Sequence, residues 1–233
     1  MAIAAAMLAA SGLRPAFALP PAQGPAAPAP RQPAAAAVCA PRRLVHIVFR
    51  DVTPGIDPAA FGAKPRTLYR LGSDKLRSEE ADDHAIHLHQ LAVIAEPNIW
   101  TANLDTGLGT HAIDPGPTFN VHYPEFAGAR VNPRLERLEF GCEADFIRDN
   151  ALKPVRTEEV EGRSYDVYRL DADGDAVEIL ETPGGAGPAF TRYFHAGKLA
   201  LAWRYDLYQL EPANDPSLFA PPAGVKFREQ TTR

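Results

Sequence analysis

Three histidines crowd one short segment, and no other group of residues in the chain has a spacing so suggestive of chemistry. If Ile86–Ile94 is a strand, His87 and His89 project from the same face, with His84 close by. Imidazoles at this spacing can hold zinc once a further ligand joins them. Other histidines that folding could bring to them are His46, His111 and His122. The pattern is compatible with a metal-dependent hydrolase, but the apolar alternate residues Ile86 and Leu88 suffice to make it an ordinary half-polar strand.

Asp105-Thr106-Gly107 is the other motif with catalytic associations. It matches the tripeptide of aspartic proteases, whose chemistry needs two carboxylates that share a proton. The chain holds one copy, and a hairpin turn across Leu104–Gly109 explains it more simply. The sequence contains no Gly-x-Ser-x-Gly nucleophile elbow and no glycine loop suited to a phosphate. We therefore expect neither enzymatic activity nor a cofactor, and assign no metal ligand.

The chain has two cysteines, Cys39 and Cys142. In an oxidising compartment, such a widely separated pair is usually interpreted as one disulfide, which would pin the start of the domain to its middle. Closing that loop would contribute about 4 kcal/mol in the chain-entropy account. Two unpaired thiols are an alternative. A lipid-anchored Cys39 is a third, although no continuous apolar segment precedes it and Val38 stands where a small residue is expected.

The first residues have most of the features of an export signal. Ala2–Leu13 is apolar and too short to span a bilayer, and Ala16-Phe17-Ala18 offers the small residues that a signal peptidase recognises. A basic residue before the apolar stretch is missing, because the first charge is Arg14. We predict a signal peptide over residues 1–18, and a protein that is periplasmic or otherwise exported.

Residues 19–37 are dominated by proline and alanine, a composition that favours extended backbone and cannot bury enough apolar surface to fold. This segment is predicted to be a linker. The remaining chain, residues 38–233, is long enough for one sizeable core, and we expect it to form a single β-rich domain.

The charge balance excludes some partners. Acidic residues outnumber basic ones by 29 to 24, and loss of residues 1–18 would make the net charge more negative still. Nucleic-acid binders usually carry a basic surplus, so we expect no nucleic-acid partner. After the leader, no apolar run is long enough to cross a bilayer, and the mature chain is predicted to lack a transmembrane anchor. The sequence leaves the oligomeric state open.

The last third of the chain predicts an antiparallel meander. Its clearest alternation is Leu199–Tyr208, in which Leu199, Leu201, Trp203, Tyr205 and Leu207 would line one face of a strand. Three strand-length runs precede it: Ser164–Leu170, Ala176–Glu181 and Ala189–Phe194. Glycine-containing boundaries separate these runs: Glu161-Gly162, Asp173-Gly174, Gly184-Gly185 and Ala196-Gly197. Glycine adopts the positive φ that tight hairpins need, which favours consecutive pairing.

The first half of the domain is also strand-rich, with expected strands over Leu44–Val52, Thr67–Leu71, Lys75–Glu79, Ile86–Ile94 and Asn98–Leu104. The alternation slips near Gln90, which a β-bulge would reconcile. Helical expectations fall on Cys142–Asn150, with acidic residues early and Arg148 late, and on Pro133–Glu139. Asp57–Phe61 and Asp215–Phe219 share an Asp-Pro start that suits one short helical turn each.

The meander over Val155–Tyr208, followed by Asp215-Pro216-Ser217-Leu218-Phe219-Ala220-Pro221-Pro222-Ala223-Gly224, resembles the C-terminal part of the LolA-like superfamily of periplasmic lipoprotein carriers and lipid-binding proteins. The resemblance covers about the last third of the chain. It implies a mainly β (α+β) fold, with a strongly curved antiparallel sheet or incomplete β-barrel and a few short covering helices. It also implies an apolar cavity for acyl chains between sheet and helices.

An exported envelope protein that binds an acyl chain, a lipid or a lipoprotein on the concave face of its sheet is the function that this resemblance and the apolar strand face favour. The residues expected to contact the ligand are Trp100, Phe194, Leu201, Trp203 and Tyr205. Plain core packing would account for each of them as well. The alternatives are the metal-dependent hydrolase that uses the histidine cluster, and an envelope assembly or scaffolding protein without a small ligand.

Overall fold

The computed structural model describes residues 38–128, 131–185, 187–211 and 215–230. The predicted signal peptide (1–18) and linker (19–37) lie outside the described residues. The described chain belongs to one compact unit, Ala37–Arg233. Its strands are β1 (Leu44–Asp51), β2 (Arg66–Leu71), β3 (Lys75–Glu79), β4 (Gln90–Ala95), β5 (Asn98–Asn103), β6 (Leu108–Ile113), β7 (Pro154–Val160), β8 (Arg163–Ala172), β9 (Asp175–Glu181), β10 (Pro188–His195), β11 (Lys198–Glu211) and β12 (Lys226–Gln230). Its helices are α1 (Glu143–Asp149) and the 3₁₀ turns η1 (Phe61–Ala63) and η2 (Pro216–Phe219).

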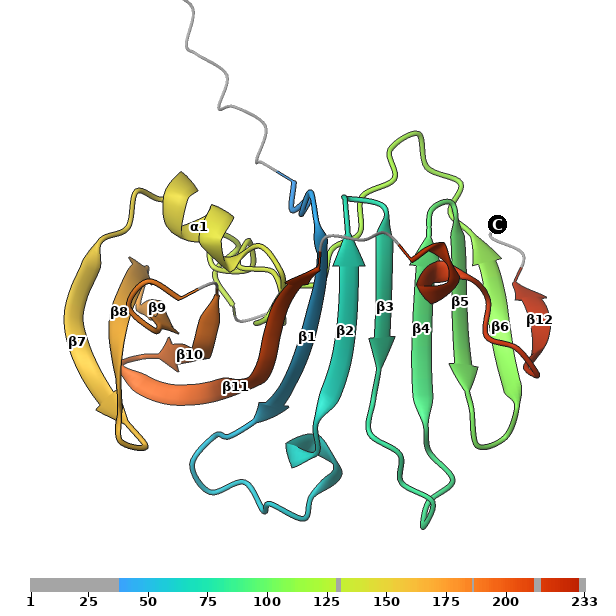
Figure 1. Ribbon diagram of the computed structural model, residues 1–233, viewed down its shortest axis with the longest axis horizontal. Helices are drawn as coiled ribbons and strands as arrows, with labels where there is room; N and C mark the ends of the chain where they lie inside the picture. Colours follow the sequence, from blue (N-terminus) through green and yellow to red (C-terminus); the bar gives the residue numbers. More distant parts are fainter. Residues whose placement is uncertain (1–37, 129–130, 186, 212–214, 231–233) are drawn as a thin grey trace, which may run out of the picture. The chain divides into compact units, whose positions relative to one another are not determined.

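These strands form one open, curved sheet of 12 strands in the order β12-β6-β5-β4-β3-β2-β1-β11-β10-β9-β8-β7 (Figure 1). Neighbouring strands are antiparallel, except that β12 runs parallel to β6. Strands β7–β11 curl under α1, and we call them with α1 the curved half. Strands β2–β6 and β12 form the flatter half, and β1 joins the two. The mainly β, curved and incomplete barrel predicted from the sequence is confirmed.

The meander of the curved half follows the turn residues that the sequence offers. Both residues of Glu161-Gly162, Asp173-Gly174 and Ala196-Gly197 have positive φ. Two such residues in succession give a hairpin turn whose twist matches that of its strands. Strands β7, β8, β9, β10 and β11 accordingly pair in sequence order.

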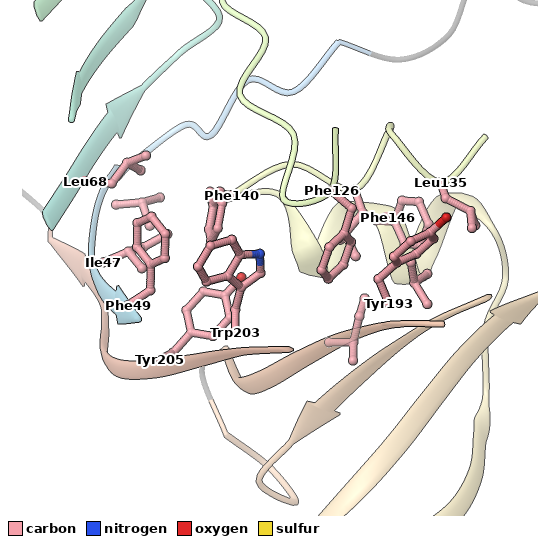
Figure 2. Close-up of a cluster of buried hydrophobic side chains, with 14 of the residues drawn as sticks. Ile47, Phe49, Leu68, Phe126, Leu135, Phe140, Phe146, Tyr193, Trp203 and Tyr205 are labelled. Atoms are coloured by element: carbon pink, nitrogen blue, oxygen red, sulfur yellow. The ribbon is translucent and has the colours of Figure 1, made fainter. Parts of the chain in front are cut away.

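The core lies between the sheet and the chain that connects β6 to α1, and Figure 2 shows its aromatic centre. We call this connection the covering segment, residues 114–128 and 131–142. The residues it buries in the core are Val121, Phe126, Leu135, Leu138 and Phe140. They meet Phe49 and Trp203 of β1 and β11, whose rings lie 4.2 Å and 6.0 Å from that of Phe140. The covering segment therefore covers the core where helices were expected, and its described residues form turns and loops.

One buried cation fastens the covering segment to the flatter half. Arg70 of β2 is fully buried, and its Nη1 lies 2.8 Å from the Oε2 of Glu139. Its guanidinium also donates to the backbone carbonyls of Cys39, Val121 and Phe140. Because a buried charge is costly unless it is paired and hydrogen-bonded, these partners explain why an arginine can occupy this position.

Two expectations for local structure are wrong. The strand predicted over Ile86–Ile94 begins only at Gln90, because residues 83–88 fold into a turn closed by the Asp83–Leu88 bridge. The slip in alternation at Gln90 therefore marks the end of a turn, and no bulge is needed. Pro133–Glu139 forms turns instead of a helix, since Leu135 and Leu138 enter the core and Glu139 pairs with Pro124.

Of the other expected helical segments, two contain a helix or a helical turn and the third differs in where its turn begins. Cys142–Asn150 contains α1, with Glu143 and Asp145 in its first turn. Asp215 caps η2 by accepting a hydrogen bond from the backbone N–H of Ser217, as predicted. In the other Asp-Pro segment, Asp57 makes the corresponding bond to the N–H of Ala59, but the 3₁₀ turn begins later, at Phe61.

Candidate functional site

A groove of about 610 Å³ lies where three elements meet: the chain that precedes β1, the start of α1 and the end of β11. Its apolar wall includes Pro41, Val45 and Leu210. The disulfide between Cys39 and Cys142 stands at this point, with an S–S distance of 2.04 Å, and joins the first of these elements to the second. Two of the three elements that form the groove are therefore covalently linked.

Arginines form the polar part of the groove. Arg42, Arg43 and Arg148 all line it. Arg148 is already paired with Asp145 and Asp149 on its own helix. Arg42 and Arg43 are both exposed. The groove therefore offers two exposed arginines beside an apolar wall.

A tyrosine and a buried carboxylate lie beneath the groove. Tyr208 lines it, and its hydroxyl donates to the Oε2 of Glu143 at 2.9 Å. Glu143 is fully buried, and its Oε1 accepts from the hydroxyl of Tyr205 and from the N–H of Gly141. Gly187 leaves room for the Tyr208 ring, since a Cβ there would stand 2.2 Å from Cδ1 of the tyrosine.

A second buried carboxylate accompanies the first. Neither oxygen of Glu125 makes a hydrogen bond to a described residue, although Thr191 and Tyr205 lie close to it. Burial, together with the neighbouring Glu143, holds the pKa of Glu125 well above its usual value. Burial also raises the pKa of Glu143, against the opposing effect of its hydrogen bonds. Burial and these carboxylates raise the pKa of Tyr205 as well. The pair therefore favours protonated carboxyl groups.

A bulge brings the two tyrosines to the same carboxylate. Tyr205 and Tyr208 have opposite parity, so a regular strand would place them on opposite faces. The register of β1 against β11 shifts between Val48, which pairs with Leu207, and Phe49, which pairs with Tyr205. The extra residue, Asp206, re-aims the strand, and Leu207 becomes exposed. The expectation that Leu207 shares a face with Tyr205 is therefore wrong.

Of the residues expected to bind a ligand, Trp203 and Tyr205 belong to the main core (Figure 2), and Leu201 is partly buried and packs against it. Trp203 donates from Nε1 to the backbone carbonyl of Glu125 at 2.8 Å. None of the three lines the groove. The covering segment fills the concave face on which a ligand was expected, and these residues pack against it.

Phe194 and Trp100, the other two residues expected to bind a ligand, lie outside the main core. Phe194 follows the core residue Tyr193 on β10 and takes the other face, where its ring centroid lies 5.3 Å from the guanidinium of Arg169. Trp100 lies in the flatter half and stacks on His111 of β6. The pairings of β3, β4 and β5 place Trp100 opposite to the face that bears Leu76 and Ile94, which is the core face.

The residues of the groove and the carboxylate pair were not expected from the sequence. The adjacent Arg42 and Arg43, just after Cys39, were the one visible signal. Glu143 was noticed only as an acidic residue that suits the first turn of a helix. Its burial depends on tyrosines more than sixty positions away, which local pattern does not reveal.

The predicted histidine cluster is divided. His84 bridges Asp82 and Asp105, which raise its pKa. His89 lies 2.9 Å from Glu79, and His87 is exposed in the turn. The three further candidate histidines have partners elsewhere: His46 stacks on Tyr69, His111 on Trp100, and His122 contacts Glu139. Asp105-Thr106-Gly107 lies in the hairpin turn between β5 and β6, as expected.

No known family model matches the chain, and no curated protein is similar to it in sequence. Similar folds occur among solved structures, at low identity. An uncharacterised conserved protein from Thermus thermophilus is 10% identical, with a TM-score of 0.44, over 81% of this chain and 91% of that one. The MucA/MucB complex of Pseudomonas aeruginosa gives 13% identity and a TM-score of 0.42, over 79% of this chain and 58% of that one.

A LolA superfamily protein from Nitrosomonas europaea is 10% identical, with a TM-score of 0.33, over 77% of this chain and 90% of that one. In the described part of the chain, no helix has the length and apolar character needed to span a membrane.

Proposed function

We propose that this chain is an exported binding protein, without enzymatic activity, that holds an amphiphile in the groove between the chain before β1, α1 and β11. The ligand class is an acyl chain or lipid that carries an anionic head group. One observation carries the proposal: two exposed arginines stand beside an apolar wall at the rim of one groove.

The arrangement of the groove supports both ends of such a ligand. Pro41 and Leu210 offer apolar contact to a hydrocarbon chain. Arg42 and Arg43 offer guanidinium groups, which bind phosphate and carboxylate groups well. A volume of about 610 Å³ lies within the usual range for a small-ligand site. The concave face does not offer this combination, because the core fills it.

Export is part of the proposal. The disulfide between Cys39 and Cys142 helps to shape the groove, and such bonds persist in oxidising compartments. The apolar start of the sequence, with its small residues at Ala16 and Ala18, supports the same location.

The test is a titration of the purified, oxidised full chain with two amphiphiles that share one tail, dodecyl phosphate and dodecyltrimethylammonium. We expect one dodecyl phosphate to bind per chain by calorimetry and native mass spectrometry, and the ammonium compound to bind at least about tenfold more weakly, a difference of about 1.4 kcal/mol. Replacing Arg42 and Arg43 together by alanine should remove this preference. Leu210→Ser should weaken the binding of both compounds.

The matched control is the double variant Lys226→Ala with Arg228→Ala, which removes two exposed positive charges from the edge strand β12. It should bind dodecyl phosphate as the parent does. Equal affinity for the two amphiphiles, no binding of either, or an equal loss in the control variant would each refute the proposal. Capture of a protein partner without lipid would instead favour the scaffolding alternative.

A further inference from the structure

Far from the groove, the connections at one end of β3–β6 gather a second set of polar side chains. Asp82 and His89 come from the chain between β3 and β4, and Asp105 from the turn between β5 and β6. Each offers one donor atom, and the three atoms lie within 4.8 Å of one another. Two carboxylates and an imidazole at such distances can converge on one cation.

An asparagine holds the two connections together. The side-chain oxygen of Asn103 accepts from the N–H groups of His89 and Asp105, at 3.3 Å and 3.1 Å. Its amide nitrogen donates to the carbonyl of His87 at 2.8 Å. Leu104 adds a backbone bond from its N–H to the carbonyl of His89. Hydrogen bonds to the backbone of both connections therefore fix the positions of His89 and Asp105 relative to each other.

The imidazole ring of His89 is oriented by a carboxylate on strand β3. Its Nε2 lies 2.9 Å from Oε1 of Glu79, and Arg77 holds the other oxygen of Glu79 at 2.8 Å. The hydrogen bonds of His89 to described residues involve Nε2 and the backbone, and none involves Nδ1. A carboxylate on one ring nitrogen, with the other nitrogen unoccupied, is the arrangement that orients metal-binding histidines in proteins.

The imidazole of His84 lies between the two aspartates. The Nε2 of His84 is 2.8 Å from Oδ2 of Asp82, and its Nδ1 is 3.2 Å from Oδ1 of Asp105. The neighbouring carboxylate, Asp83, takes no part, because Lys64 and the N–H of Ala85 already occupy it. The two aspartates therefore already share a side chain that can carry positive charge.

We propose that Asp82, His89 and Asp105 bind one divalent transition-metal ion, with zinc as the best match. Mixed imidazole and carboxylate donors suit zinc and its neighbours, whereas calcium takes six to eight oxygen ligands, more than this site offers. The metal site shares no residue with the groove, and does not depend on the proposed amphiphile binding.

Calorimetric titration of the metal-free full chain with zinc chloride tests the site. We expect one ion per chain, and Co²⁺ in its place should give the visible absorption bands of a bound, low-symmetry ion. Asp105→Asn preserves the size of the side chain and should weaken zinc binding at least about tenfold, by removing a charged ligand. His89→Ala should do the same.

His87→Ala is the matched control, because His87 lies in the same turn and is exposed, outside the donor set. It should bind zinc as the parent does. Circular dichroism checks that each variant is folded, and Asp105→Asn decides the outcome if His89→Ala is not. The proposal is wrong if the parent binds no stoichiometric zinc, if His87→Ala loses as much affinity as the other variants, or if Asp105→Asn loses none.

Discussion

The curved half of the sheet has a pair of carboxylates inside the fold, whereas the flatter half has a pair in the connections between its strands. Glu125 and Glu143 are buried between the covering segment, α1 and β11. Asp82 and Asp105 stand in loops at the end of the flatter half. The first pair is protected from water and from ions, and the second is open to both. One continuous sheet thus carries polar groups for two different uses.

The two halves also differ in how completely their side chains are buried. The curved half is closed on its inner side by the covering segment, which places an aromatic cluster around Trp203 (Figure 2). The flatter half has partly exposed strands. The first and last residues of β6, Leu108 and Ile113, are both more than half exposed. We therefore expect the free energy of unfolding to depend mainly on the curved half and its attachments.

The largest effect should come from the attachment itself, through Arg70→Leu. This change leaves Glu139 buried without its cation and frees three backbone carbonyls, so the loss of unfolding free energy should be about 5 kcal/mol. Urea unfolding followed by circular dichroism measures it. Arg77→Leu on the neighbouring strand removes a partly exposed ion pair and should cost less than about 1 kcal/mol. Similar losses of unfolding free energy in the two variants would mean that Arg70 does not fasten the covering segment to the flatter half.

The two tryptophans compare the halves directly, since the chain has one in each. Trp203→Ala empties a buried position of the aromatic cluster and should cost about 3–4 kcal/mol. Trp100→Ala removes a partly exposed side chain and should cost about half as much. Fluorescence of the single-tryptophan forms Trp100→Phe and Trp203→Phe would report unfolding in each half. An equal cost for both alanine variants would contradict the ranking.

The smallest effect concerns pH and the carboxylate pair. The pKa of Glu125 is higher in the folded chain than in the unfolded chain, so the folded state binds more protons above the unfolded pKa. Stability should therefore fall as pH rises from about 4.5, by at most about 1.4 kcal/mol per pH unit for one proton. Glu125→Gln should flatten this dependence.

Thermal melts of the parent and of Glu125→Gln between about pH 4.5 and pH 8 give the comparison. Glu159→Gln, on the exposed strand β7, is the control and should keep the slope of the parent. A parent whose stability rises over this range would show that Glu125 does not dominate the pH dependence.

Local chemistry made much of the fold predictable. Alternation along β8–β11 and positive-φ turns such as Asp173-Gly174 depend on neighbours in sequence, so the meander could be inferred. The bulge at Asp206 could not, because it depends on how β11 pairs with β1. One extra residue was enough to undo the expected alternation beyond Tyr205.

The sites were harder to infer, for the same physical reason. The groove depends on Arg42, Tyr208 and Arg148 meeting after folding, and none of them belongs to a motif. The histidine cluster drew attention to the right segment, but its partners are aspartates, one of them in a distant hairpin. The aromatic residues expected to bind a ligand were large and apolar, and that property suits the core equally.

The disulfide between Cys39 and Cys142 bears on the order of events in the life of the protein. Cys39 lies just before Arg42 and Arg43, and Cys142 lies just before α1, so the bond aligns both sides of the groove. Without this bond, the arginines would still be held beside β1, because the carbonyls of Pro41 and Cys39 accept hydrogen bonds from Gly72 and Arg70. If the groove holds a ligand as proposed, its capture would therefore not have to wait for oxidation.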